Sequence, residues 1–159
     1  MAMYHLRAKF ISRGKGHSAV AAAAYRACDK LTDNRTGATH DYTRKGALDH
    51  SEMLVPEGTP EWLQDRSTFW NVIETQPHPR AQLALEVEVA LPRELTRDQC
   101  VELARRFAQE QFVSRGVIVD LAIHRPIAAD GLEHPHCHML IAQRRFDEHG
   151  KMGNTTRDM

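Results

Sequence analysis

The sequence predicts an α+β fold in which helices cover one side of a central, largely antiparallel β-sheet. Three observations from the second half of the chain support this prediction. Residues 82–91 alternate strictly between two faces, as a half-buried strand does. Residues 96–116 follow with helical spacing, and two further β-like runs occupy residues 117–124 and 135–146. The predicted order along the whole chain is strand, helix, loop, helix, strand, helix, strand, strand.

The composition is that of one globular domain spanning residues 1–159. A chain of 159 residues, of which 42% are hydrophobic, can bury a core and is not charged enough to be disordered. No apolar run approaches the ~20 residues of a membrane span, and the N-terminus lacks an apolar signal region. We therefore expect a cytoplasmic protein without membrane insertion. Residues 150–158 are polar and lack a core-forming pattern, so we expect the domain to be the N-terminal fragment of a longer protein.

The first third of the chain is basic. Residues 1–50 carry nine Lys and Arg against four Asp and Glu, so an anionic partner is expected to bind there. Residues 3–10 are predicted to form a strand with one buried and one basic face. The buried face would consist of Tyr4, Leu6, Ala8 and Phe10, and the basic face of His5, Arg7 and Lys9. A flexible basic loop follows at residues 12–17.

Two helices are predicted between this loop and residue 82. Ser18 is the expected N-cap of an alanine-rich helix that runs to about Leu31 and carries Tyr25 beside its apolar stripe. Residues 32–58 are polar and turn-prone, which favours loop and short strand over helix. The next helix is predicted to begin at Thr59, because a proline follows this residue.

The strand at residues 82–91 displays two carboxylates side by side. Glu86 and Glu88 share one face, because alternate residues of a strand point in the same direction. Such a pair is by default a solvated sheet surface. The helix that follows begins with a capping-box pattern formed by Thr96 and Gln99.

Three histidines on the last two predicted strands indicate a metal site. His136 and His138 are separated by one residue, so both imidazoles point to the same face. His124 ends the neighbouring strand and would supply a third ligand. Three imidazoles leave coordination positions open for substrate, which is typical of a catalytic site. Asp120 shares a face with His124 and is predicted to fix the tautomer of His124 through a hydrogen bond.

Five motifs carry a family resemblance and occur in one order along the chain. They are SAVAAAAYRA at residues 18–27, DNRTG at 33–37, HDY at 40–42, AIHRP at 122–126 and HPHCHML at 134–140. Together they resemble the N-terminal relaxase domain of the MobA/MobL family of plasmid mobilisation proteins. This family belongs to the HUH endonucleases, which are named for two histidines that flank a hydrophobe. The resemblance implies a central antiparallel sheet that holds a metal, with a tyrosine on a nearby helix.

The resemblance also implies roles for individual residues. Tyr25 matches the nucleophile. His136 and His138 match the paired metal ligands, and His124 matches the third. Glu86 and Glu88 match the acidic motif of the middle strand, and the choice between them is left open. His134 stands where relatives often carry Asn, so it is a rival third ligand.

The activity implied by the resemblance is metal-dependent tyrosine transesterification, in which one strand of plasmid DNA is nicked at an origin of transfer. Attack would leave a 5′-phosphotyrosine and a free 3′-hydroxyl, and the strand would later be rejoined during conjugative mobilisation. The implied cofactor is Mn²⁺ or Mg²⁺, although Ni²⁺ or Zn²⁺ could bind in vitro. The implied partners are single-stranded DNA, relaxosome accessory proteins and a type IV secretion coupling protein. Phosphate contacts would come from Arg7, Lys9, Arg13, Lys15, Arg26, Arg44 and Lys45.

Two alternatives stay open. A rolling-circle replication initiator or transposase of the same superfamily would use the same chemistry. In those proteins the tyrosine helix usually follows the two-histidine strand, whereas Tyr25 precedes it by more than a hundred residues. A non-nuclease His/carboxylate metalloenzyme would instead leave Tyr25 with a structural role.

Overall fold

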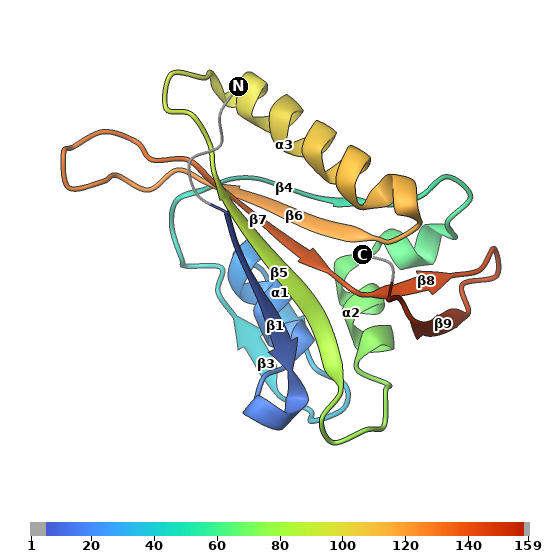
Figure 1. Ribbon diagram of the computed structural model, residues 1–159. Helices are drawn as coiled ribbons and strands as arrows, with labels where there is room; N and C mark the ends of the chain where they lie inside the picture. Colours follow the sequence, from blue (N-terminus) through green and yellow to red (C-terminus); the bar gives the residue numbers. More distant parts are fainter. Residues whose placement is uncertain (1–5, 158–159) are drawn as a thin grey trace.

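The computed structural model describes residues 6–157 and contains a five-stranded central sheet (Figure 1). Its strand order is β1-β5-β7-β6-β4, and every neighbouring pair is antiparallel. The strands are β1 (Leu6–Ser12), β4 (Leu48–Leu54), β5 (Gln82–Ala90), β6 (Val119–His124) and β7 (His136–Ile141). The predicted fold class, an antiparallel sheet with flanking helices, is confirmed.

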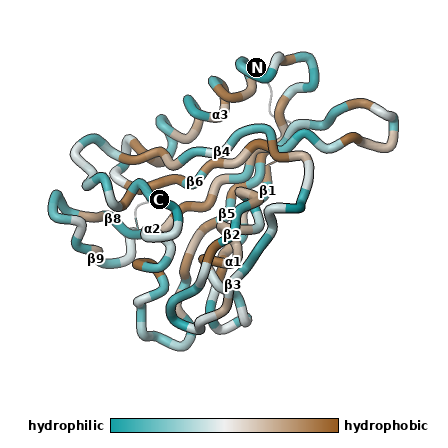
Figure 2. Tube along the Cα trace, turned by 180° about the vertical axis from the view of Figure 1, so that it is seen from behind, coloured by the Kyte–Doolittle hydropathy of each residue, from teal (hydrophilic) through white to brown (hydrophobic). Residues whose placement is uncertain are grey.

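Helices cover both faces of this sheet, so the prediction of helices on one side was wrong. Helices α1 (Ala19–Ala27) and α2 (Arg66–Ile73) pack on one face, where Ala84 and Leu140 join their core. Helix α3 (Arg97–Gln111) packs on the other face, against a core that includes Val87 and Met139. The central strands therefore contribute apolar residues to a core on each face, and Figure 2 shows hydrophobic segments along the central sheet and along α1.

Short elements complete the chain. The 3₁₀ helices are η1 (Arg13–Lys15), η2 (Glu61–Gln64) and η3 (Val113–Arg115). Two small hairpins pair β2 (Lys30–Thr32) with β3 (Thr39–Asp41), and β8 (Arg144–Phe146) with β9 (Met152–Thr155). The single strand predicted at residues 135–146 is therefore two strands, because β8 leaves the central sheet to pair with β9. Among the described residues, no helix combines the length and apolar character needed to cross a membrane.

Strand β1 lies at the edge of the sheet, and its predicted buried face is exposed. Leu6 is 59% exposed and Phe10 is 41% exposed. The reason is that α3 packs over β4 and β6 and leaves this edge uncovered. Residues 3–5 of the predicted strand lie outside the described residues.

Helix α1 begins as predicted and ends earlier than predicted. The Oγ atom of Ser18 accepts a hydrogen bond from the backbone nitrogen of Ala21 at 3.1 Å, which confirms the N-cap. The helix stops at Ala27, because Cys28 adopts the left-handed conformation with a φ of 51°. Leu31, the predicted end of the helix, lies instead in β2.

Helix α3 begins as predicted, whereas the helix predicted from Thr59 is two separate helices. Thr96 and Gln99 form the predicted capping box of α3. The helix predicted from Thr59 is divided into η2 and α2 at Asp65, which has an extended backbone. The side chain of Asp65 caps α2 by accepting a hydrogen bond from the backbone nitrogen of Thr68. Within residues 32–58, strand β4 joins the central sheet by pairing with β6, so this strand is longer than the short strand expected there.

Candidate metal centre

The strand register brings the predicted acidic and histidine residues onto one face of the sheet. Glu88 on β5 pairs with His138 on β7, and His136 on β7 pairs with His124 on β6. Paired residues of antiparallel strands share a face. This face is the one that α1 covers, because Glu86 on it contacts Arg26 of α1.

Glu88, His136 and His138 form a cluster that could hold a metal ion. One ligand atom from each lies within 4.8 Å of the others. Oε1 of Glu88 lies 3.5 Å from Nδ1 of His136 and 4.0 Å from Nε2 of His138. In addition, Nε2 of His136 and Nδ1 of His138 are buried without a hydrogen-bond partner. Two imidazoles and a carboxylate whose ligand atoms lie this close together fit a divalent cation.

Burial keeps two of the imidazoles neutral, which is the form that binds metals. Desolvation is the main cause that lowers the pKa of His136, and the charge of His134 adds to it. Desolvation likewise lowers the pKa of His124 to about 4. Both rings therefore carry a lone pair at neutral pH.

The ring of His124 lies beside the cluster. The ring meets that of His138 edge to face, with 5.2 Å between centroids. Its Nε2 donates a hydrogen bond of 2.6 Å to the backbone oxygen of Arg26, which leaves Nδ1 as the acceptor nitrogen. The rival ligand His134 stacks edge to face on His136 at 4.5 Å, and both line a cavity of about 310 Å³ with Arg7 and Glu88.

The predicted hydrogen bond between Asp120 and His124 was wrong. Four residues along a strand span roughly 13 Å, so a shared face does not bring these side chains together. The buried Asp120 instead accepts hydrogen bonds from Arg66 at 2.8 and 2.9 Å and from Trp70 Nε1 at 2.9 Å. Asp120 therefore anchors α2 to the sheet.

The two adjacent glutamates have different surroundings. Glu86 is 4% exposed and forms an ion pair with Arg26. Burial raises the pKa of Glu86, but the neighbouring His138, whose Nδ1 lies 3.9 Å from Oε1 of Glu86, and the charges of Arg26 and Lys9 lower it more. The pKa of Glu86 therefore lies below its usual value. Glu88 is half-buried and faces the cavity that His136 also lines.

Tyr25 lies on the last turn of α1 and is 43% exposed. It lines a second cavity, of about 330 Å³, together with Lys9, Arg26 and Tyr42. The next residue, Arg26, contacts both Glu86 and His124. Helix α1 therefore connects the predicted nucleophile to the histidine and glutamate face of the sheet.

The seven predicted phosphate-binding residues fall into two groups. Four are exposed, namely Arg7, Lys9, Lys15 and Arg44. The other three contact groups within the protein. Arg13 donates to the backbone oxygen and to Oε1 of Glu74, Arg26 pairs with Glu86, and Lys45 donates to the backbone oxygen of Tyr25.

The sequence did not predict that Glu74 stabilises the start of α1. This carboxylate is 2% exposed and accepts a hydrogen bond of 2.8 Å from the backbone nitrogen of Ala19, at the start of α1. It also pairs with Arg13 and Arg35. Glu74 follows α2 in the sequence, and no periodicity or motif links it to α1.

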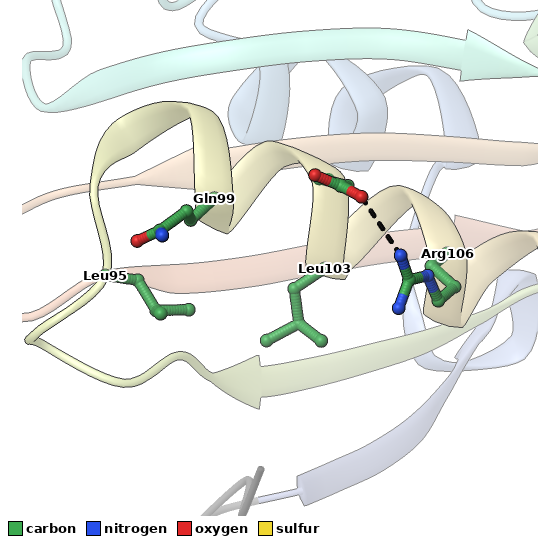
Figure 3. Close-up of a pocket in the computed structure, with 5 residues that line it drawn as sticks. Leu95, Gln99, Leu103 and Arg106 are labelled. Atoms are coloured by element: carbon green, nitrogen blue, oxygen red, sulfur yellow. Dashed lines mark hydrogen bonds and ion pairs between the residues drawn. The ribbon is translucent and has the colours of Figure 1, made fainter.

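A further cavity lies on the opposite face of the sheet, beside α3 (Figure 3). Its volume is about 200 Å³, and its lining includes Leu95, Gln99 and Leu103. An exposed ion pair between Glu102 and Arg106 borders it. This cavity contains none of the predicted site residues.

The fold and the site define a class of protein in which an antiparallel sheet carries an imidazole–carboxylate cluster next to a tyrosine-bearing helix. Residues 17–159 match the MobA/MobL family, and the chain belongs to this family. It is 49% identical to "Mobilization protein MobL" of Acidithiobacillus ferridurans, in a match that covers 79% of this chain and 33% of the relative. It is 35% identical to "Conjugal transfer protein TraA" of Agrobacterium fabrum, with coverages of 94% and 14%. The chain thus spans a third or less of the length of these relatives.

A solved structure supports the same fold. It is described as "Molecular Basis of Vancomycin Resistance Transfer in Staphylococcus aureus" and is 31% identical to this chain. The TM-score is 0.87, and the match covers 99% of this chain and 78% of that chain.

Proposed function

We propose that this chain is a relaxase domain that nicks one strand of plasmid DNA at an origin of transfer and later rejoins it during conjugative mobilisation. The observation that carries the proposal is the Glu88–His136–His138 cluster, whose sheet face is tied to the tyrosine helix through Arg26. Membership of the MobA/MobL family, with relatives named for mobilisation and conjugal transfer, supports the biological role.

His136 and His138 would hold a divalent metal together with Glu88, and His124, whose ring contacts that of His138, would supply the third imidazole. A bound Mn²⁺ or Mg²⁺ would supply positive charge that stabilises the phosphate oxygens during attack. Ni²⁺ or Zn²⁺ would also suit the imidazoles in vitro.

The chain's own residues would carry out the transfer. Tyr25 Oη attacks the scissile phosphorus, the new bond links the tyrosine oxygen to the 5′-phosphate, and the bond to the 3′-oxygen breaks. The phenol proton passes to Glu86, Glu88 or water, and the leaving 3′-oxygen takes up a proton to become a hydroxyl. Because one phosphodiester replaces another, a 3′-hydroxyl can later attack the phosphotyrosine and reseal the strand.

The substrate would be single-stranded or locally melted DNA, because the scissile phosphate has to reach Tyr25 and the cluster. The exposed cations Arg7, Lys9, Lys15 and Arg44 would contact its phosphates, which makes binding depend steeply on salt. We further propose that the protein acts in the bacterial cytoplasm with relaxosome accessory proteins and a type IV secretion coupling protein.

A covalent-capture experiment tests the proposal. A pool of random single-stranded oligonucleotides is incubated with the protein and Mn²⁺, with and without chelator, and separated on a denaturing gel. A metal-dependent protein–DNA band that Tyr25→Phe abolishes is expected, and sequencing the attached strands identifies the nick site. A band that survives Tyr25→Phe would overturn the assignment of the nucleophile. A metalloenzyme with a structural tyrosine would bind metal equally well in both proteins and form no band.

A further inference from the structure

We propose that Lys45 is a positioning residue for Tyr25, holding its ring in one orientation instead of contacting a DNA phosphate. The catalytic meaning of this inference rests on the function proposed above. The contacts between the two residues are independent of that function.

Lys45 contacts Tyr25 at two points. Its Nζ atom lies 3.6 Å from the centroid of the Tyr25 ring, and it donates a hydrogen bond of 3.2 Å to the backbone oxygen of Tyr25. An ammonium over an aromatic face is attracted by the negative charge of the ring face. Lys45 is half-buried, whereas the neighbouring Arg44 is exposed. The charge of Lys45 is therefore directed at Tyr25.

Tyr42 contacts the same ring. The Tyr25 and Tyr42 rings meet edge to face, with centroids 5.1 Å apart and an angle of 84°. Tyr42 belongs to the same segment as Lys45, and the backbone nitrogen of Lys45 donates to the backbone oxygen of Tyr42 at 3.0 Å. Residues 42–47, which we call the tyrosine clasp, thus contact the Tyr25 ring through both Lys45 and Tyr42.

The tyrosine clasp is anchored at both ends. The backbone nitrogen of Tyr42 donates to the oxygen of Asp29 at 3.0 Å, and the oxygen of Ala47 accepts from the nitrogen of Arg125 at 2.8 Å. Ala47 has a φ of 74°, in the left-handed region that a residue with a Cβ rarely adopts. The surrounding contacts therefore keep the segment in place against backbone strain.

Tyr25 needs such support because 43% of its surface is exposed and an exposed side chain exchanges among rotamers. Only a rotamer that aims Oη in line with the phosphate would react. The guanidinium of Arg26 lies 5.1 Å from the ring centroid but is engaged by Glu86. Lys45 and Tyr42 are thus the contacts that select the orientation of the ring.

Fluorine NMR tests the contact without using activity. The protein contains three tyrosines, and 3-fluorotyrosine labelling places one resonance on each. Tyr25→Phe identifies the signal of Tyr25. We expect Lys45→Met to move that signal and Lys45→Arg to restore most of its position. Lys151→Met, which removes an exposed lysine next to β9, should leave it unchanged. A Tyr25 signal that does not move in Lys45→Met would overturn the proposal.

Kinetics then test the positioning role. For Lys45→Met we expect the single-turnover rate of covalent attachment at saturating oligonucleotide to fall about tenfold, since orientation of the attacking group is lost. The oligonucleotide Kd and its salt dependence should stay as in wild type. A weaker Kd, a log–log salt slope reduced by about one and an unchanged saturating rate would identify a phosphate contact and overturn the proposal. If wild type forms no adduct at all, the proposed function fails, and the fluorine experiment still decides whether Lys45 orients Tyr25.

Discussion

The backbone oxygen of Arg26 accepts a hydrogen bond of 2.6 Å from Nε2 of His124. The guanidinium of Arg26 pairs with the buried Glu86. A single residue next to Tyr25 thus connects the last turn of α1 with strands β5 and β6. Because these contacts couple the helix to the sheet, both stability and the site should respond to changes at Arg26.

Arg26→Met should destabilise the protein by about 3 kcal/mol, because it leaves the carboxylate of Glu86 buried without its cation. The free energy of unfolding in urea, followed by circular dichroism, measures this loss. Arg106→Met is the matched control, since it breaks an exposed pair with Glu102 and should cost less than about 0.5 kcal/mol. Equal losses of unfolding free energy in the two variants would contradict the prediction, because the ion pair of Arg26 and Glu86 would then contribute no more than an exposed pair.

Metal affinity should depend on the members of the cluster. We expect Glu88→Gln and His136→Asn each to weaken Mn²⁺ binding at least about tenfold, because the first removes the negative charge of the cluster and the second removes an imidazole ligand. Calorimetric titration of the apoprotein measures the affinity. His134→Asn should bind Mn²⁺ like wild type, and a comparable loss in this variant would instead make His134 a ligand.

Asp120→Asn should lower stability without changing metal affinity. Its buried carboxylate holds Arg66 and Trp70. Losing the negative charge leaves the mostly buried guanidinium of Arg66 dependent on the partly exposed Asp29, whose Oδ2 lies 3.7 Å away, and should cost about 2 kcal/mol. Urea unfolding and Mn²⁺ titration of the same sample separate the two effects. A tenfold loss of metal affinity in the folded variant would contradict this prediction, because it would indicate that Asp120 does support His124 at the metal site.

Lowering the pH should reduce the stability of the apoprotein because of His124. Burial sets the pKa of His124 at about 4 in the folded state, below its ordinary value of 6.5. Below pH 6.5 His124 is protonated in the unfolded chain but stays neutral in the folded protein. The free energy of unfolding therefore falls as the pH drops towards 4. The contribution is roughly 3 kcal/mol over this range.

Urea unfolding in the presence of chelator, at a series of pH values, measures this contribution. His124→Asn should show a smaller loss of stability over the same range than wild type. His149→Asn, which changes an exposed histidine, should follow the wild-type curve. Identical slopes for wild type and His124→Asn would contradict the assignment.

The sequence by itself determined the local elements whose signals are short-range. Alternation predicted β5 with Glu86 and Glu88 on one face, and the spacing of His136 and His138 predicted that their rings share a face. The caps at Ser18 and Thr96 were confirmed because a side chain and a backbone nitrogen three residues away decide them.

Tertiary structure decided which surfaces these elements cover and which side chains meet. The apolar face of β1 is exposed because strand order puts β1 at an edge, and Asp120 turns to Arg66 and Trp70 because α2 packs there. The contact between Lys45 and Tyr25 joins a loop to a helix twenty residues away. Periodicity and capping report only on residues within a few positions of one another. Long-range contacts depend instead on how all the strands and helices pack at once.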